Sequence, residues 1–443
     1  MQKVISQGIL SYKNKKKEHV VAKRRLNIYR AVFCYSFLFV ICLVGFTVSA
    51  VQAQWTQWGG PNGNFQVAPQ KLATDWGETG PKISWRRDLG EGYSAISVDD
   101  GVLYTMYRRE EEEVVIALDG QTGETKWEYV YGAPKWKGFN TGHGPGPHST
   151  PLIIGDYVYT VGVRVHLHCF NKKSGQVVWS HDLWKEFDAK PPGRGYASSP
   201  IVYKNMLILP VGGRSGNGIM AFDPKDGDVI WKSQNYPATF SSPTIINVDG
   251  QDQVVVFEGT EVVGLEPNTG DLLWTHPHET KYNINAMTPV WGADNLLFVS
   301  SAYDGGSRVI RLTQKDGKTS VEELWYSRSV ELHHGTAVRL GDMIYTSSGD
   351  FGPAFLVGIN AKTGEPTAKQ RGFAKATFVA VGDDVILLDE DGELAIATPS
   401  VDGFKIHAQA QILSTRAWAA PTLVGTTVYV RDRKEIVAVD LSP

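Results

Sequence analysis

The sequence predicts an all-β fold, an eight-bladed β-propeller of four-stranded antiparallel blades whose N- and C-terminal strands close the ring. Three observations predict it: a motif that recurs along the chain, tryptophans at a regular spacing, and an isolated strand-like segment at residues 82–89. Regular repeats of this kind are typical of proteins in which each unit forms one propeller blade. The composition, 42% hydrophobic and 21% charged, is that of a globular protein and excludes disorder.

The recurring motif predicts the end of each blade. It reads ALDGQTGETKWEY at 117–129, and its clearest copies are CFNKKSGQVVWSH (169–181), AFDPKDGDVIWKS (221–233) and GLEPNTGDLLWTH (264–276). Weaker copies lie at 311–327, 358–370 and 397–409, with a truncated copy at 438–443. Its tryptophans, Trp85, Trp127, Trp179, Trp231, Trp274 and Trp325, are spaced by 42, 52, 52, 43 and 51 residues. The turn glycine supplies the positive φ of a hairpin loop, and the tryptophan can fill the wedge between blades.

Small residues open each unit before its first strand. The residues that precede these openings are Tyr93, His148, Ala197, Phe240, Ala286, His334, Lys375 and Trp418, which predicts eight blades. The last unit lacks its tryptophan strand, whereas KISWRRDL (82–89) precedes the first opening. We therefore expect the N-terminal strand to complete the C-terminal blade and remove two exposed sheet edges. A seven-bladed ring is the alternative, because the sixth and seventh units lack the tryptophan.

The N-terminal residues indicate export. Residues 1–53 hold nine Lys or Arg and one acidic residue, and residues 31–51 are uncharged. With the small residues Val51 and Ala53, this pattern indicates a signal peptide cleaved after Ala53; a membrane anchor formed by residues 31–51 is the alternative. In both cases the remaining chain is extracytoplasmic, either periplasmic or secreted. The expected parts are the basic and hydrophobic segment 1–53, a leader segment 54–81 and the propeller 82–443.

The charge and cysteine content of the exported part exclude some classes of partner and bond. Residues 54–443 hold 35 basic and 46 acidic residues, a formal net charge of −11. Such a surface is a poor match for nucleic acid, and only an uncleaved anchor would bring the protein to a membrane. Cys169 is the only cysteine after residue 53, so no intrachain disulfide is expected there.

The repeat A-x-D-x-x-T-G-x-x-x-W resembles that of the pyrroloquinoline-quinone-like (PQQ-like) propeller family, over roughly residues 82–443. The string WTQWGGPNGNF (55–65) also resembles the leader found ahead of the ring in many exported members. The resemblance implies the architecture but no single activity. The family includes quinoprotein dehydrogenases and a non-catalytic scaffold of outer-membrane protein assembly.

The dehydrogenase members of the family imply PQQ with Ca²⁺ as a cofactor. They resemble one another in a pair of adjacent cysteines near the quinone, a Glu/Asn/Asp calcium cluster and a carboxylate base. Here neither the cysteine pair nor the calcium ligands can be matched residue by residue. Asp304 and Asp350 fall in loops expected near the cofactor side, so a carboxylate base stays open. The string DEDGE (389–393) resembles part of a calcium loop but lies where a hairpin turn is expected.

Basic and aromatic residues are expected to gather at one mouth of the central channel, because the first strand of each blade lines the axis. The candidate ligand-binding residues are Tyr93, His148, Arg194, Tyr196, Phe240, Asn285, His333, His334, Lys375, Arg416 and Trp418. Such a mouth would suit a planar anion or a sugar. The alternative is that these loop residues belong only to the scaffold. The long loop 130–150, with Trp136, Lys137 and His143, is a further functional candidate.

Three functions are compatible with these patterns. The first is a non-catalytic binding or scaffold module of the cell envelope, with a protein partner or a small anionic or sugar ligand. The second is a PQQ-dependent alcohol or sugar dehydrogenase, with the cofactor over Trp418 and His334 and an acid such as Asp350 as base. The third is a carbohydrate-recognition propeller. No catalytic residue and no metal site is assigned, and hydrolase elbows and phosphate loops are missing from the sequence.

Overall fold

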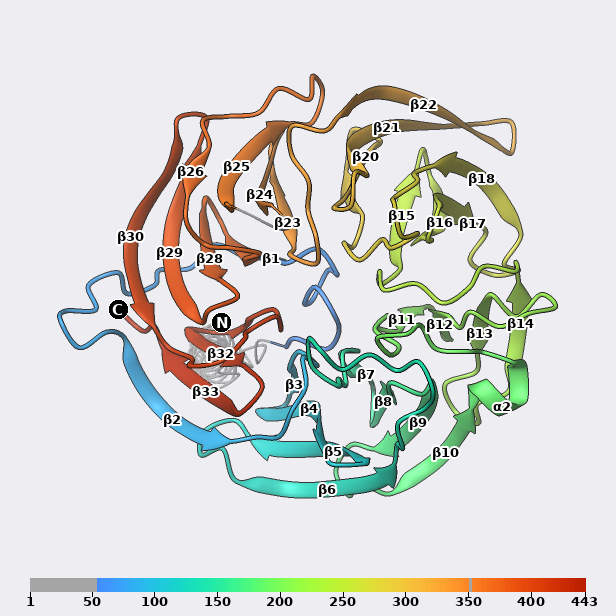
Figure 1. Cartoon of the computed structure of the whole chain (residues 1–443), viewed down its shortest axis with the longest axis horizontal. Coiled ribbons are helices and arrows are strands. Elements are labelled where there is room, and N and C mark those ends of the chain that lie inside the picture. The colour runs from blue at the N-terminus through green and yellow to red at the C-terminus, as the bar shows by residue number, and fades with distance from the viewer. Residues whose placement is uncertain (1–53, 350–352) are drawn as a thin grey trace, which may run out of the picture. The chain divides into compact units, whose positions relative to one another are not determined.

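The computed structural model describes residues 54–349 and 353–443. These residues form eight sheets arranged around a central axis, as Figure 1 shows. The predicted signal peptide or anchor at residues 1–53 lies outside the described residues. Within 54–349 and 353–443, no helix is long and apolar enough to cross a membrane.

The first four blades are each built from four consecutive strands, from the axis outwards. Blade one contains β3 (Ser97–Asp99), β4 (Val102–Arg109), β5 (Glu112–Asp119) and β6 (Thr125–Gly132). Blade two contains β7 (Leu152–Ile154), β8 (Tyr157–Val161), β9 (His166–Asn171) and β10 (Val177–Asp182), followed by the short helix α2 (Leu183–Phe187). Blade three contains β11 (Ile201–Tyr203), β12 (Met206–Pro210), β13 (Ile219–Phe222) and β14 (Val229–Ser233). Blade four contains β15 (Thr244–Val248), β16 (Gln251–Phe257), β17 (Glu261–Leu265) and β18 (Leu272–Pro277).

The remaining four blades include the seam of the ring. Blade five contains β19 (Val290–Gly292), β20 (Leu296–Ser301), β21 (Gly306–Lys315) and β22 (Lys318–Ser327). Blade six contains β23 (Ala337–Leu340), β24 (Met343–Ser348), β25 (Phe355–Asn360) and β26 (Gln370–Arg371). Blade seven contains β27 (Thr377–Val381), β28 (Asp384–Leu388), β29 (Glu393–Ser400) and β30 (Gly403–Gln411), and it gains β1 (Gln66–Val67) as a fifth strand. Blade eight contains β31 (Thr422–Val424), β32 (Thr427–Arg431), β33 (Glu435–Asp440) and β2 (Lys82–Asp88).

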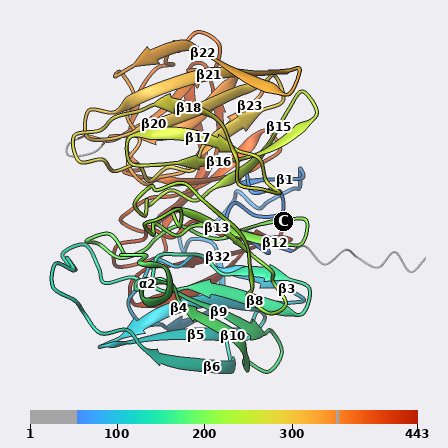
Figure 2. The ribbon, with the colours of Figure 1, turned by 90° about the vertical axis from the view of Figure 1, so that its right-hand side faces the viewer.

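The eight blades and the closure by terminal strands confirm the predicted fold, and the seven-bladed alternative is wrong. Strand β2 is the outermost strand of blade eight and pairs antiparallel with β33, from Lys82 opposite Asp440 to Asp88 opposite Glu435. The central strands are buried on both faces, whereas the outermost strands are largely exposed, as β5 and β6 illustrate. Figure 2 shows the same blades edge-on.

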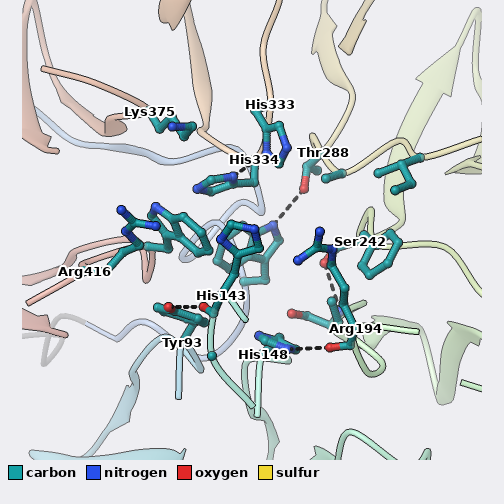
Figure 3. A pocket seen from close by; sticks show the side chains of 18 of the residues that line it. Tyr93, His143, His148, Arg194, Ser242, Thr288, His333, His334, Lys375 and Arg416 are labelled. Carbon is teal, nitrogen blue, oxygen red and sulfur yellow. Dashed lines mark hydrogen bonds between the residues drawn. The ribbon is translucent and has the colours of Figure 1, made fainter. Parts of the chain in front are cut away.

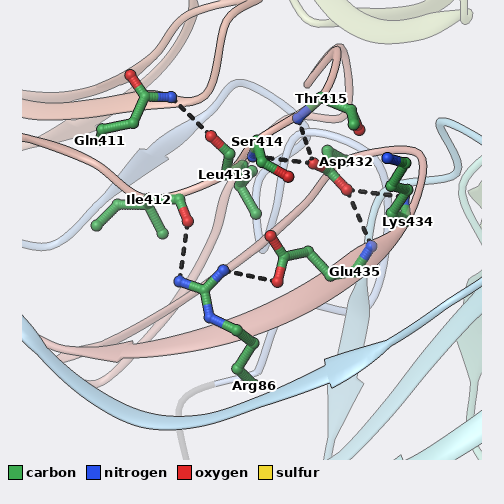
Figure 4. A network of polar contacts seen from close by, with 9 residues as sticks. All are labelled: Arg86, Gln411, Ile412, Leu413, Ser414, Thr415, Asp432, Lys434 and Glu435. Carbon is green, nitrogen blue, oxygen red and sulfur yellow. Dashed lines mark hydrogen bonds and ion pairs between the residues drawn. The ribbon is translucent and has the colours of Figure 1, made fainter.

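A polar network fastens the seam where the two ends of the chain meet (Figure 4). The Arg86 guanidinium binds the Glu435 carboxylate at 2.6 Å and donates to the carbonyl of Ile412 in the preceding connection at 2.9 Å. The Asp432 carboxylate accepts from the backbone N–H groups of Ser414, Thr415, Lys434 and Glu435. These bonds hold the pKa of Asp432 below its ordinary value, although burial of the carboxyl acts in the opposite direction. The last turn of the chain, the end of blade seven and the N-terminal strand are thereby joined.

The recurring tryptophan joins five of the described blades to the next one. Trp127 in blade one donates its Nε1–H to the carbonyl of Lys172 in blade two, at 2.8 Å. Its ring covers Gly175, where an added Cβ would lie 2.6 Å from the indole. The same pairing of a carbonyl and a glycine is made by Trp85 with Gly120 and Gly123, Trp179 with Pro224 and Gly227, Trp231 with Pro267 and Gly270, and Trp325 with Ala361 and Gly364. The turn glycine is therefore required for close approach as well as for its positive φ.

Trp274 is the exception among these tryptophans. It donates to Oε1 of Gln253 within its own blade, at 2.7 Å. In the next blade, β21 and β22 are ten residues long each, so their hairpin turn extends beyond the usual docking position. An added Cβ on Gly317 in that turn would meet nothing within 4 Å.

Hydroxyl groups of the small-residue openings join neighbouring blades near the axis. Ser198 in blade three donates to the carbonyl of Ser241 at 2.6 Å, and Ser241 in blade four donates to the carbonyl of Met287 at 2.8 Å. At the seam, the Thr422 hydroxyl donates to the carbonyl of Ile96 in blade one at 2.6 Å. A large side chain would not fit between first strands that approach this closely, which explains why small residues recur there.

The two kinds of turn glycine give a stability prediction. Gly175 and Gly317 both have positive φ, 70° and 75°, but only Gly175 is covered by a tryptophan of the preceding blade. Gly317→Ala should lower the free energy of unfolding by about 1 kcal/mol, the cost of a left-handed residue with a Cβ. Gly175→Ala should lower it by about 3 kcal/mol, because the Cβ also overlaps the Trp127 ring. Urea unfolding of the two variants measures both values, and equal losses would contradict the role given to this contact.

Candidate functional site

A cavity of about 440 Å³ lies where the segments before the first strands of all eight blades converge. Each residue predicted to precede a first strand lines it, one from every blade: Tyr93, His148, Ala197, Phe240, Ala286, His334, Lys375 and Trp418. Figure 3 shows the labelled side chains pointing into this space from around the ring. The propeller thus brings together residues that are separated by as many as 325 positions in the sequence. We call this space the mouth cavity.

Nine of the eleven candidate ligand-binding residues line the mouth cavity, and two do not. The nine are Tyr93, His148, Arg194, Phe240, His333, His334, Lys375, Arg416 and Trp418. Tyr196 is fully buried and donates its hydroxyl to the carbonyl of Pro210 at 2.8 Å. Asn285 is also fully buried, and its amide donates to the carbonyl of Glu258 at 2.5 Å. Both side chains connect loops behind the wall of the cavity.

Trp418 is the centre of the aromatic wall. Its ring centroid lies 4.3 Å from that of His334, 5.0 Å from that of Tyr93 and 6.0 Å from that of His143. The Arg416 guanidinium lies 5.0 Å from the same ring, a cation–π contact. The Trp418 indole N–H is fixed by a hydrogen bond of 3.0 Å to the Glu390 carboxylate. The ring is therefore held in place before any ligand arrives.

The cations of the mouth cavity differ in how far they are neutralised. Glu390 binds Lys375 at 3.0 Å and lies 3.8 Å from Arg416, so both cations share one carboxylate. Burial raises the pKa of Glu390, but the bonds from Lys375 and Trp418 outweigh burial and lower it. The guanidinium of Arg194 has no ion-pair partner among the described residues. Arg194 is thus the cation most available to an incoming anion.

The histidines of the mouth cavity are held neutral. Burial lowers the pKa of His148 to about 4, although its hydrogen bond to the Arg194 carbonyl opposes this shift. Because that carbonyl can only accept a hydrogen bond, Nε2 of His148 carries the proton and donates to the carbonyl oxygen, which lies 3.1 Å away. Burial, then the charges of Lys375 and Arg194, lower the pKa of His333 to about 4. At neutral pH these rings are therefore hydrogen-bonding groups and not cations.

A chain of polar groups enters the mouth cavity from blade five. The Tyr303 hydroxyl bonds to Nε2 of His333, and Nδ1 of His333 bonds to Nδ1 of His334. Burial, then the neighbouring His333, holds the pKa of His334 well below its ordinary value. Nε2 of His334 is buried and has no hydrogen-bond partner in the described part of the chain. That nitrogen lies beside Trp418 and is buried below the surface of the cavity.

The cofactor implied by the dehydrogenase members can be tested against these donors. None of the described residues that line the mouth cavity is Asp or Glu, and no group of three or more His, Cys, Asp or Glu in 54–349 and 353–443 is placed to hold a metal. Cys169 is buried in β9, opposite Trp179 of β10 in the strand pairing, with its Sγ 4.0 Å from the carbonyl of Pro224. The described residues therefore do not fit PQQ bound through Ca²⁺ and an adjacent cysteine pair. Asp350 lies outside the described residues, and Asp304 does not line the cavity.

Glu390 and Trp58 are among the groups at the site that were not predicted from the sequence. Glu390 lies in DEDGE (389–393), which was assigned only to a turn; it is indeed a turn between β28 and β29, but it reaches Lys375 and Trp418. The signal was its place after a second strand, the same criterion that singled out Asp304. The other is Trp58 of the leader segment, which lines the cavity and which no repeat position marks.

The long loop 130–150 contributes to the mouth cavity only through its second half. Asn140, His143 and Gly144 line the cavity, and the Tyr93 hydroxyl donates to the carbonyl of His143. Trp136 instead stacks on Phe139 at the rim, with centroids 4.1 Å apart, and Lys137 is exposed.

Comparison with known proteins shows which proteins the chain is similar to. A family model described as outer membrane protein assembly factor BamB matches residues 131–350. A protein of Rickettsia prowazekii is 23% identical over 193 residues, 42% of each chain, so this chain spans under half of that relative. The outer membrane protein assembly factor BamB of Burkholderia pseudomallei is 23% identical over 300 residues, 65% of this chain and 72% of that protein. A quinoprotein ethanol dehydrogenase of Pseudomonas putida is 29% identical over 161 residues, 33% of this chain but only 23% of the enzyme.

Solved structures agree in fold. The crystal structure of BamB from Moraxella catarrhalis matches with a TM-score of 0.58 and 17% identity, over 81% of this chain and 99% of that one. The quinohemoprotein alcohol dehydrogenase from Comamonas testosteroni matches with a TM-score of 0.60 and 12% identity, over 88% of this chain and 80% of the enzyme. The protein is therefore an eight-bladed repeat propeller. It is similar to proteins of the PQQ-like propeller family.

The neutral state of His148 gives a pH prediction. Its pKa is about 4 in the folded protein and 6.5 ordinarily, so between these values the unfolded chain binds a proton that the folded protein does not. The free energy of unfolding should therefore fall as the pH is lowered from about 6.5 to about 4. In His148→Gln, which keeps an N–H donor for the Arg194 carbonyl, the slope should be shallower by about one proton.

Urea unfolding across this pH window measures both slopes. Phe240→Leu changes the same cavity without a titrating group and should keep the wild-type slope. A His148→Gln slope that equals the wild-type slope would contradict the assigned neutral state.

Proposed function

We propose that the protein is a non-catalytic binding module of the cell envelope, extracytoplasmic, which holds a small flat anion in the mouth cavity. The observation that carries this proposal is the lining: aromatic rings and the cations Arg194, Lys375 and Arg416, without a carboxylate among the described lining residues. Counting Glu390, the site has a formal charge of about +2, whereas the exported part of the chain is acidic. A positive recess in a negative surface concentrates anions at the recess.

The size and shape of the mouth cavity support a small ligand. Its volume of about 440 Å³ lies within the usual range for small-molecule sites, and apolar walls with a few placed polar groups are typical of such sites. Trp418 offers a ring face and Arg194 a charged donor. A planar anion suits both groups.

The polar groups of the lining support binding without covalent chemistry. The hydroxyls of Ser199 and Ser242 accept hydrogen bonds from backbone N–H groups of the adjacent blades and thereby hold the ring together. His148 is bound to a backbone carbonyl, and His333 to Tyr303 and His334. None of these bonds pairs a serine hydroxyl with a histidine base, which nucleophilic catalysis would need.

The anion hypothesis predicts opposite effects of two charge changes at one site. Arg194→Gln should weaken binding of naphthalene-2-carboxylate about tenfold, because it removes the cation without an ion-pair partner. Glu390→Gln should strengthen binding severalfold, because Lys375 and Arg416 then face the ligand alone. Isothermal titration at low salt measures both affinities.

Methyl glucoside serves as the uncharged comparison ligand. If the sugar binds and both charge variants bind it as the wild type does, the carbohydrate-recognition alternative replaces the anion hypothesis. Absence of binding by naphthalene-2-carboxylate to the wild type would remove the anion hypothesis itself.

A PQQ-dependent dehydrogenase is the alternative function, favoured by the similarity to a quinoprotein ethanol dehydrogenase. Because the described lining does not fit the calcium ion, we expect the purified protein with PQQ and Ca²⁺ to reduce no dye on a panel of alcohols and sugars. Dye reduction that depends on both PQQ and the substrate would contradict the binding-module proposal. A genuine quinoprotein dehydrogenase, assayed in parallel, controls for active reagents.

A protein partner in the envelope is the other part of the proposed role. It is supported by the family model, whose description is that of an outer membrane protein assembly factor. The outermost strands of blades two to four carry exposed aliphatic side chains such as Val178, Ile230 and Leu272, which could contact another protein.

A further inference from the structure

The leader segment does not stand ahead of the ring but crosses its centre, as the blue trace in Figure 1 shows. Trp55 pairs with Val98 of β3 through two backbone hydrogen bonds of 2.9 and 2.8 Å. The carbonyl of Thr56 accepts from the N–H of Ile153 in β7 at 2.8 Å. The leader is therefore fixed to the innermost strands of blades one and two before it turns across the axis.

Trp58 connects the leader to blade five, on the opposite side of the cavity. Its indole Nε1–H donates to the hydroxyl of Thr288, ahead of β19 in blade five, at 2.8 Å; the bond that Thr288 receives is drawn in Figure 3. Its other contact is edge-to-face with Phe65, at 5.0 Å between centroids and 87° between planes. Phe65 is 3% exposed, whereas Trp58 is only half-buried and lines the mouth cavity. One ring thus supports the other while leaving indole surface open to the cavity.

A second cavity, of about 130 Å³, lies on the other side of this crossing. It is lined by residues 62–66 of the leader and by the starts of the first strands of blades four to six. Thr288 lines both cavities. The hydrogen bond between Trp58 and Thr288 therefore lies where the two cavities meet.

The leader is also held after the crossing. The carbonyl of Phe65 accepts from the N–H of Ala380, and Gln66 and Val67 pair with Ala380 and Val381 of β27 as a parallel strand. The side chain of Gln66 donates to the carbonyl of Arg339 in blade six at 2.9 Å. Because the leader is bonded to the blades on both sides of Trp58, the Trp58 ring is already held in one position. Ligand binding therefore costs little further conformational entropy of this ring.

We propose that the leader is part of the binding site, with Trp58 as the surface on which the flat ring of the ligand lies, so that ligand binding and leader threading stabilise each other. This inference rests on the proposed function, since it needs a ligand in the mouth cavity. A ligand that contacts Trp58 binds only the threaded state and so stabilises that state. By the same linkage, a leader that is firmly threaded binds the ligand more tightly. The ligand class is an anion with a flat ring, because a ring face is what the leader adds to the cations of the blades.

The direct test compares the affinities of two anions for variants of Trp58 and of its hydrogen-bond partner. Trp58→Ala should weaken naphthalene-2-carboxylate about tenfold, whereas Trp58→Phe should restore most of the affinity, because a stacking face remains. Thr288→Val, which removes only the hydrogen bond to the indole, should weaken it by a smaller factor. Trp136→Ala, outside the cavity, is the matched control and should bind as the wild type does. Cyclohexanecarboxylate, an anion without a flat ring, should lose little affinity in Trp58→Ala; an equal loss for both anions would overturn the stacking role.

The coupling has its own measurement. In the intact exported chain, amide hydrogen exchange of residues 59–67 should slow when naphthalene-2-carboxylate is saturating, and exchange in the hairpin around Gly317 should not change. Unchanged exchange at residues 59–67 with ligand bound would overturn the coupling. If Arg194→Gln weakens binding but Trp58→Ala does not, this inference fails and the proposed function stands. If the wild type binds no such anion, both fall.

Discussion

The ring depends on a contact that five of the eight described blades make with their neighbour, the docking of a tryptophan on the glycine turn of the following blade. The contact combines a hydrogen bond with the packing of a large ring on a residue without a side chain, as between Trp127 and Gly175. Neither residue has this role inside its own blade, because its partner belongs to the next unit. The two residues therefore recur together in the sequence. A substitution of either residue therefore weakens mainly the contact between two blades, and less the pairing within its own sheet.

The same contact explains which parts of the fold could be predicted from sequence. Where the docking is present, motif and spacing define a blade unambiguously. Blade six ends in β26, only Gln370–Arg371, and has no tryptophan, so its unit could be counted only from the small residues before its first strand and a weak copy of the motif at 358–370. The long hairpin of blade five and the crossing of the leader had no periodic signal. Such segments are positioned by tertiary contacts alone, and a string such as WTQWGGPNGNF (55–65) indicates turns without indicating where they lead.

The candidate site was predictable to the extent that it follows from symmetry. One residue from each blade lines the mouth cavity because each precedes a first strand, and this rule needs only the repeat. Residues one to three positions away obey no such rule: Arg194 reaches the cavity, whereas Tyr196 and Asn285 point into the loops behind it. Glu390 and Trp58 come from a turn and from the leader, whose contacts depend on the closed ring. The repeat therefore predicts the ring and one lining residue from each blade. It does not predict side chains that come from a turn or from the leader, such as Glu390 and Trp58.

The use of β2 as the outermost strand of the last blade has a consequence for biosynthesis. The ribosome makes β2 long before β33. Until β33 has been made, the backbone N–H and C=O groups of β2 have no partner strand. During that interval the first blades can assemble, but the circle has two open sheet edges, each able to pair with another chain. The two open edges therefore need protection from other chains until β33 has been made. The ring closes only when β2 pairs with β33, after all the blades between them have formed.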